Sequence, residues 1–267
     1  MADEPLDRSA TDDALQYNAQ VYAQYYRNPL LMYRYDLLYR EQRIGRLLDD
    51  HIDVKRPGFR ALEYGFGAGH LLRVVSGASS VQGFEASPSA VERARAMAPK
   101  SHAAWSMREW SDATQLPVPD ASVDLMTASH VLEHVEDDDA ALDEWIRVVA
   151  PGGHLLLLLP SNERLFPGSK HLRLYARDSF RARLASKGLI EVCVDEHQRF
   201  DRPFKDHRLI LFSRRGTIPK LLVDGPRTAL FLPPAVISWH LLRALDALLS
   251  RFGARSSSIA YLFRKPA

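Results

Sequence analysis

The sequence predicts an α/β protein built on a doubly wound, mostly parallel sheet of seven strands. From residue 60 onwards, short apolar runs alternate with stretches of helical pattern. This order is typical of parallel strands that are connected by helices packed on the sheet. The run Leu155–Leu159 is apolar at every position, so we expect both faces of that strand to be covered.

The predicted strands cover residues 60–64, 80–85, 102–106, 123–128, 154–159, 189–194 and 258–263. Helices are predicted between them at about 70–75, 88–97, 138–149 and 177–187. Pro88 is favoured in a first helical turn, and Asp137–Asp139 are favoured at the start of the third helix. Helix ends are predicted at Pro151-Gly152-Gly153 and at Gly188. A helical N-terminal extension, residues 14–52 with a break at Pro29, precedes the first strand. A helical insertion, with an amphipathic helix near 234–252, precedes the last strand.

Composition excludes several kinds of protein. The chain has 267 residues, 35 basic and 33 acidic side chains, 46% hydrophobic residues and one cysteine. Cys193 alone forms no internal disulfide, so a reducing compartment is the simple expectation. A net charge of +2 is too small to indicate a nucleic-acid partner. From the polar N-terminal residues we expect no signal peptide, and the apolar stretch 229–249 is interrupted by charges. We expect a cytoplasmic protein, with peripheral membrane contact left open and the oligomeric state unassigned.

The most specific local pattern is a glycine-rich turn between the first predicted strand and the first predicted helix. Gly65, Gly67 and Gly69 are spaced G-x-G-x-G. Glycine allows a tight turn, and its missing side chain lets a ligand approach the backbone. The dinucleotide fingerprint G-x-G-x-x-G would need glycine where this chain has His70. That departure disfavours a nicotinamide or flavin cofactor.

Two acids follow at positions that suit a nucleoside. Glu85 stands twenty residues after Gly65, at the end of the second predicted strand, where a carboxylate accepts hydrogen bonds from both ribose hydroxyls. Asp112 follows the third predicted strand, where it suits an adenine amine. Each acid alone has a structural interpretation as a strand end or loop cap. The order and spacing of the three elements together favour a nucleoside site.

These segments resemble class I S-adenosylmethionine-dependent methyltransferases, of the methyltransferase type 11 group that includes ubiquinone- and menaquinone-biosynthesis enzymes. The resemblance covers about residues 60–160. It is carried by LEYGFGAG at 62–69, GFEAS at 83–87, SDA at 111–113, LPVPDASVDL at 116–125, SHVLEHVED at 129–137 and RVVAPGG at 147–153.

The resemblance implies a Rossmann-like core, S-adenosyl-L-methionine as cofactor and S-adenosyl-L-homocysteine as product. Its implied cofactor-binding residues are Glu63, Gly65, Gly67, Gly69, Glu85, Ala86, Asp112, Ala113 and Ser129. Glu63 would reach the methionine ammonium, and Ser129 would line the pocket after the fourth strand. An N-terminal tyrosine, Tyr17 or Tyr25, would close over the cofactor.

Transfer to an oxygen or nitrogen atom also needs a proton acceptor. His134 and His130 follow the fourth predicted strand, at the sheet edge where open α/β folds bind ligands, so both are candidate bases. A structural role for His134 is equally compatible with its position. His130, Glu133 and His134 at spacing i, i+3, i+4 would share one helical face and could bind a divalent ion. We nevertheless assign no metal ligand.

We divide the chain into an N-terminal lid (1–52), a cofactor-binding core (53–200 with 258–267) and an insertion (201–257). The insertion forms a substrate wall, a dimer contact or an interfacial helix, and its helix carries a polar stripe of Arg243, Asp246 and Ser250. Further substrate-binding candidates are the polar residues His171, Arg173, Tyr175, Arg199 and His207.

The expected function is methyl transfer by in-line displacement to an O, N or C nucleophile of a small-molecule or lipid-like acceptor. Three alternatives remain: a metal-assisted O-methyltransferase, a non-catalytic S-adenosylmethionine-binding protein and a nicotinamide-dependent oxidoreductase.

Overall fold

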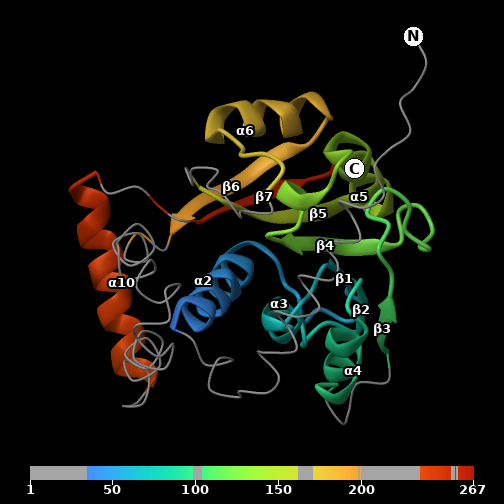
Figure 1. The fold of residues 1–267 in the computed structure, drawn as a ribbon, viewed down its shortest axis with the longest axis horizontal. Helices are drawn as coiled ribbons and strands as arrows, with labels where there is room; N and C mark the ends of the chain where they lie inside the picture. The colour runs from blue at the N-terminus through green and yellow to red at the C-terminus, as the bar shows by residue number, and fades with distance from the viewer. Residues whose placement is uncertain are drawn as a thin grey trace, which may run out of the picture.

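A computed structural model describes residues 35–98, 104–161, 171–197, 199, 235–253, 256 and 258–267 (Figure 1). Its centre is a seven-stranded sheet in the order β3-β2-β1-β4-β5-β7-β6. The strands are β1 Arg60–Tyr64, β2 Ser80–Glu85, β3 Trp105–Glu109, β4 Val123–Ser129, β5 Val149–Pro160, β6 Ile190–His197 and β7 Ser258–Arg264. Neighbours among β1–β5 pair in parallel, whereas β7 is antiparallel to both β5 and β6. The predicted doubly wound, mostly parallel sheet is therefore confirmed.

Helices cover both faces of this sheet. The described helices are α2 Tyr35–His51, α3 His70–Val74, α4 Pro88–Ala96, the 3-10 turn η2 Leu132–His134, α5 Asp138–Val148, α6 Arg177–Ser186 and α10 Ala235–Arg251. In Figure 1, α5 and α6 lie on one side of the sheet, α2, α3 and α4 lie on the other, and α10 stands beside α2. Among the described residues, no helix is long and apolar enough to cross a membrane.

The two faces of β5 bury alternate side chains in two separate cores. Leu155, Leu157 and Leu159 pack with α5 and α6, where Trp145 is fully buried. Leu156 and Leu158 pack with α2, α3 and α4 on the opposite face. The prediction that both faces of this strand are covered is therefore confirmed, because each face packs against its own layer of helices.

Three element boundaries differ from the prediction. The third strand lies at 105–109 rather than 102–106, because its pairing with β2 sets Glu109 level with Glu85. The fifth strand begins at Val149 and takes in the Pro-Gly-Gly segment that was expected to end the preceding helix. The sixth strand continues to His197, where it pairs with Ser258 of β7. The predicted helix at residues 14–34 and the candidates Tyr17, Tyr25 and His207 lie outside the described residues.

Polar contacts attach α2 to the β6 side of the sheet. Arg43 Nε donates to Asp195 Oδ2 over 2.8 Å, and the Tyr39 hydroxyl donates to Asp246 of α10 over 3.1 Å. Burial raises the pKa of Asp195, but hydrogen bonds from Arg43 and His197 outweigh it and hold this pKa well below its ordinary value. The Asp195 carboxylate is therefore a charged link between a helix and an edge strand.

We predict that Asp195→Asn lowers the free energy of unfolding at pH 7 by about 2 kcal/mol, because charge-assisted hydrogen bonds are lost. A carboxyl whose folded pKa is depressed stabilises the fold above its unfolded pKa of about 3.9 and loses that effect as pH falls further. The difference between wild type and variant, measured by denaturant unfolding, should therefore shrink below about pH 4. Asp178→Asn, which removes an exposed partner of Arg181, is the matched control. Equal stability of wild type and Asp195→Asn at pH 7 would contradict this role.

Candidate functional site

The glycine turn after β1 is held in a conformation that favours glycine. Gly65, Gly67 and Gly69 have φ of 68°, 46° and 78°, all in the left-handed region. The Gly65 amide donates to Phe84 O of β2 over 2.8 Å, which attaches the turn to the neighbouring strand. The helix that follows, α3, has only five residues, so its dipole is small. The amides of all three glycines already donate within the protein, so the turn offers a ligand mainly its backbone surface.

Position 70 explains why this is not a dinucleotide turn. His70 is buried, and its Nδ1 lies 3.2 Å from Glu41 Oε2 of α2. Burial lowers the pKa of His70, against the opposing effect of Glu41. In the dinucleotide fingerprint, the third glycine lets the helix pack closely against the strand. Here that position is occupied by His70, which packs against α2.

Glu85 at the end of β2 joins the glycine turn to the next helix. Its Oε2 accepts from the Gly67 amide over 2.8 Å, and its Oε1 accepts from the Ser87 amide over 3.0 Å. Burial raises the pKa of Glu85, although these amide hydrogen bonds work in the opposite direction. The Ala86 amide also donates to Glu85. Because an ionised carboxylate has about four acceptor sites, it keeps acceptor capacity for a ligand hydroxyl beside these amides.

A second carboxylate, Glu63 of β1, lies in the same region and is almost completely buried. Among the residues that the structure describes, none forms a hydrogen bond to its Oε2. Burial raises the pKa of Glu63 well above its ordinary value, and the nearby charge of Glu85 raises it further. A buried acid without a partner is costly, so this position suits a ligand that brings a cation or a donor.

The ends of β1, β2 and β3 bring the third acidic element to the same edge. Tyr64 donates its hydroxyl proton to Ser111 O over 2.9 Å, and the Trp110 amide donates to Glu85 O over 3.0 Å. Asp112 is exposed, and its Oδ1 accepts from both the amide and the hydroxyl of Thr114. The residues proposed for the adenine side, Ala86, Asp112 and Ala113, therefore follow neighbouring strands. Asp112 also caps its own turn.

The segment after β4 departs from the predicted helical face. His130 has φ of 54° and lies outside the 3-10 turn Leu132–His134, so His130, Glu133 and His134 do not share one face of an α-helix. The His130 amide donates to Leu158 O of β5, which turns the chain away from the sheet directly after Ser129. The helical geometry expected for this triplet is therefore wrong.

The two histidines of this segment contact side chains from other parts of the chain. His130 Nδ1 lies 3.3 Å from Glu133 Oε1, and His130 Nε2 lies 3.4 Å from the Ser258 hydroxyl. The ring of His134 packs edge-on against the ring of His171, with centroids 4.9 Å apart. Sequence reasoning placed His171 only among general substrate candidates, because nothing in the spacing links it to His134.

Val131 brings this segment to the glycine turn. A Cβ placed on Gly65 would lie 2.4 Å from Val131 Cγ2, so glycine at position 65 is required by packing as well as by φ. This contact was not predicted, because it joins residues 66 positions apart. It places the His130–His134 segment next to the backbone that would carry the cofactor.

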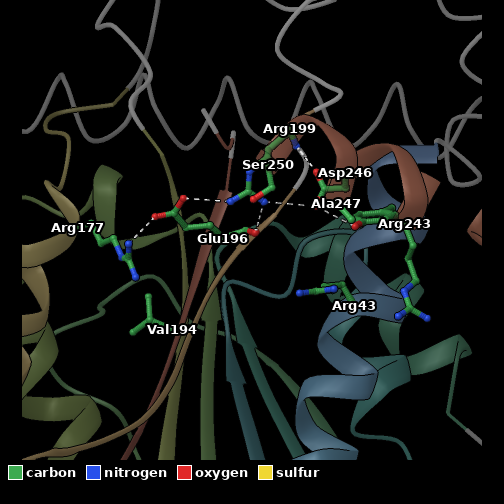
Figure 2. Close-up of a pocket in the computed structure, with 10 residues that line it drawn as sticks. Arg43, Arg177, Val194, Glu196, Arg199, Arg243, Asp246, Ala247 and Ser250 are labelled. Atoms are coloured by element: carbon green, nitrogen blue, oxygen red, sulfur yellow. Dashed lines mark hydrogen bonds and ion pairs between the residues drawn. The ribbon is translucent and has the colours of Figure 1, made fainter. Parts of the chain in front are cut away.

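A separate cavity of about 410 Å³ lies between β6, α2 and α10. Figure 2 shows that its polar lining includes four arginines, Arg43, Arg177, Arg199 and Arg243. Arg43 pairs with Asp195, Arg177 pairs with Glu196 over 3.1 Å, and Arg199 pairs with Glu196 and Asp246. We refer to it as the arginine cavity.

The arginine cavity lies at the same sheet edge as the glycine turn, because β6 ends there. Four strand spacings separate β6 from β1, or roughly 19 Å. Arg243, Asp246 and Ser250 of α10 all line it, which confirms that the predicted polar stripe faces one environment. The other side of α10 exposes Leu241, Leu245 and Leu248.

Two further substrate candidates have structural partners instead. Arg173 pairs with Asp138 over 2.5 Å, and the Tyr175 hydroxyl donates to Asp138 and to Leu132 O. These contacts join Arg173 and Tyr175, which precede α6, to the start of α5 and to the turn Leu132–His134. Of the five candidates, Arg199 alone among the described residues lines the arginine cavity.

Residues 62–157, which carry both the glycine turn and the His130–His134 segment, match the family described as a methyltransferase domain. This segment is similar to methyltransferase domains, and it makes up about a third of the chain. The match ends inside β5, so the domain's last two strands and α10 lie beyond it.

Two relatives are similar to parts of this chain. A 27-O-demethylrifamycin SV methyltransferase from Amycolatopsis mediterranei is 31% identical over 163 residues, which are 55% of this chain and 60% of the relative. A ubiquinone/menaquinone biosynthesis C-methyltransferase from Vibrio campbellii is 42% identical over 66 residues, 25% of this chain and 26% of the relative. The aligned regions thus span less than two thirds of either relative.

A solved structure extends the similarity in fold over most of the chain. The [4+2]-cyclase SpnF has a TM-score of 0.54 at 20% identity, covering 84% of this chain and 80% of that one. Its name specifies a reaction other than methyl transfer, so fold similarity at this level identifies architecture alone.

We predict that Gly65→Ala weakens binding of S-adenosylmethionine at least about tenfold, because the new methyl group displaces Val131 and strains a left-handed residue. Gly58→Ala is the matched control: Gly58 also has a left-handed φ of 78°, but nothing lies within 4 Å of a Cβ placed on it. It should lose stability by about 1 kcal/mol and keep its cofactor affinity. Isothermal titration calorimetry measures both affinities, and equal values in the two variants would contradict the packing argument.

Proposed function

We propose that this chain transfers the methyl group of S-adenosylmethionine to an oxygen, nitrogen or carbon nucleophile of a small-molecule or lipid-like acceptor. The observation that carries the proposal is the pairing of Glu85 with the Gly67 amide close to the buried Glu63, whose Oε2 accepts no hydrogen bond from the described residues. These two carboxylates match two separate parts of the cofactor. Glu85 would accept the ribose hydroxyls, and Glu63 would receive the methionine ammonium.

The residues present fit the cofactor chemically. When bound, the cofactor supplies a methyl group already activated by a sulfonium, so the protein's contribution is to position the reactants and exclude water. Gly65, Gly67 and Gly69 leave the backbone open to close approach. Ala86, Asp112 and Ala113 would border the adenine, and Ser129 would line the space beside the turn.

An oxygen or nitrogen acceptor also has to lose a proton, and His130 and His134 are the candidate bases. The geometry favours His130, because the carboxylate of Glu133 lies 3.3 Å from its Nδ1 and would orient the ring and stabilise its protonated form. The relatives leave the acceptor atom open, since one is named for an O-demethylated compound and the other as a C-methyltransferase.

The acceptor would enter from the side of the extension and the insertion. Residues 1–52 would act as a lid, residues 53–200 with 258–267 as the cofactor-binding core, and residues 201–257 as a wall. The arginine cavity would receive an anionic part of the acceptor. Exposed Leu241, Leu245 and Leu248 of α10 suit a lipid-like acceptor, a membrane surface or a dimer contact.

Glu63→Gln should reduce S-adenosylmethionine affinity, because the ammonium loses its charged partner. It should also change how stability depends on pH. A carboxyl whose folded pKa is raised makes the cofactor-free protein less stable as pH rises between its unfolded pKa, about 4.3, and its folded pKa. Thermal unfolding of cofactor-free Glu63→Gln should lack this part of the decline.

Glu92→Gln, an exposed substitution on α4, is the control and should behave as wild type in both measurements. If Glu63→Gln bound the cofactor with wild-type affinity, the assignment of Glu63 to the ammonium would be wrong.

Methyl transfer itself is tested with labelled S-adenosylmethionine and extracts of cellular metabolites and lipids, followed by mass spectrometry of the labelled products. Wild type should label an acceptor, and Glu85→Ala should not. For an oxygen or nitrogen acceptor, His130→Ala should reduce kcat by about 100-fold or more. Cofactor binding without transfer to any extract component would instead support a non-catalytic binding protein.

A further inference from the structure

Three side chains near the glycine turn converge in a way that the sequence spacing does not predict. One potential ligand atom from each of Glu133, His134 and His171 lies within 4.8 Å of the others. Glu133 is fully buried, whereas both histidines are half-buried and therefore reachable. We propose that Glu133, His134 and His171 form a binding site for a divalent transition-metal ion such as Zn²⁺.

The backbone builds this cluster from two segments distant in sequence. The Leu172 amide donates to Glu133 O over 2.8 Å, which sets His171 beside Glu133 and His134. The same two segments are fastened further along by Arg173, whose guanidinium donates to Glu136 O over 2.6 Å. The position of His171 is thus fixed by main-chain and side-chain hydrogen bonds rather than by the imidazole alone.

The donor set determines the class of ion. Two imidazoles and one carboxylate are the ligands of a catalytic zinc site, which keeps a fourth position open. Imidazole favours Zn²⁺ and other late first-row ions over Mg²⁺ and Ca²⁺, which prefer oxygen ligands. Tetrahedral coordination at about 2.0–2.1 Å would set the ligand atoms about 3.4 Å apart, so side-chain rotations would have to close the present spacing.

A further contact supports the buried carboxylate. His130 Nδ1 lies 3.3 Å from Glu133 Oε1, so His130 would act as an outer residue that orients the ligand. A buried carboxylate needs positive charge nearby, and a divalent ion supplies it. A protonated His130 could supply part of the same charge, and the metal titration below separates the two arrangements.

The site has a consequence for the acceptor, and this part rests on the proposed methyltransferase function. Val131, which packs against Gly65, immediately follows His130 and precedes the Leu132–His134 turn. An ion there would lie on the acceptor side of the cofactor turn. Its open position would bind a hydroxyl or phenol oxygen of the acceptor and lower the pKa of that group. The acceptor class would then be an oxygen nucleophile.

The test measures metal binding alone, without cofactor or acceptor, on tag-free full-length protein stripped with a chelator. Co²⁺ is titrated and followed by its visible absorption, and Zn²⁺ is titrated by calorimetry. Wild type should bind one ion per chain. His171→Ala and His134→Ala should weaken binding at least about 100-fold, and His130→Ala should weaken it about 10-fold. His51→Ala, an exposed substitution at the end of α2, should bind as wild type.

Circular dichroism and S-adenosylmethionine affinity verify that each variant is folded. No bound ion in folded wild type, or wild-type metal affinity in folded His171→Ala, would overturn the proposal. Metal binding that depends on His171 in a protein that transfers no methyl group would uphold the site and reject the proposed function separately.

Discussion

The carboxylate of Glu85 is the constraint on which the candidate site depends. It accepts one amide from the glycine turn and another from the start of α4, so it fixes the distance between the ends of β1 and β2. A buried carboxylate is stable there because backbone amides compensate part of its desolvation. The hydrogen bonds that hold this carboxylate come from the protein's own backbone, and a nucleoside would use its remaining acceptor positions. Glu63 of β1 differs, because its Oε2 accepts no hydrogen bond from the described residues.

The sheet order places every candidate group at one edge. The parallel strands β1, β2, β3, β4 and β5 all end on the side where the glycine turn lies, and the antiparallel β7 begins there. The glycine turn, the His130–His134 segment and the arginine cavity consequently lie along that one edge. Two hydrophobic cores, one on each face, hold the strands in register and leave this edge to polar residues.

Local pattern was sufficient to predict much of this arrangement. The glycine turn and the polar stripe of α10 follow from spacing within one element, and Glu85 follows from its distance along the chain to Gly65. The third strand was displaced because its sequence, WSMRE, has little apolar alternation, so its pairing with β2 sets its limits. The helix expected around His130–His134 failed because His130 adopts a left-handed conformation. The approaches of Val131 to Gly65 and of His171 to His134 are tertiary contacts, and no local pattern encodes them.

The junction between β6 and β7 has a consequence for the connection between them. His197 pairs directly with Ser258, so the sixty residues between them connect two partners at the same position of one strand pair. The entropic penalty of closing such a loop grows only slowly with its length. A change in the length of this connection would therefore leave the pairing of β6 with β7 and the order of the sheet unchanged.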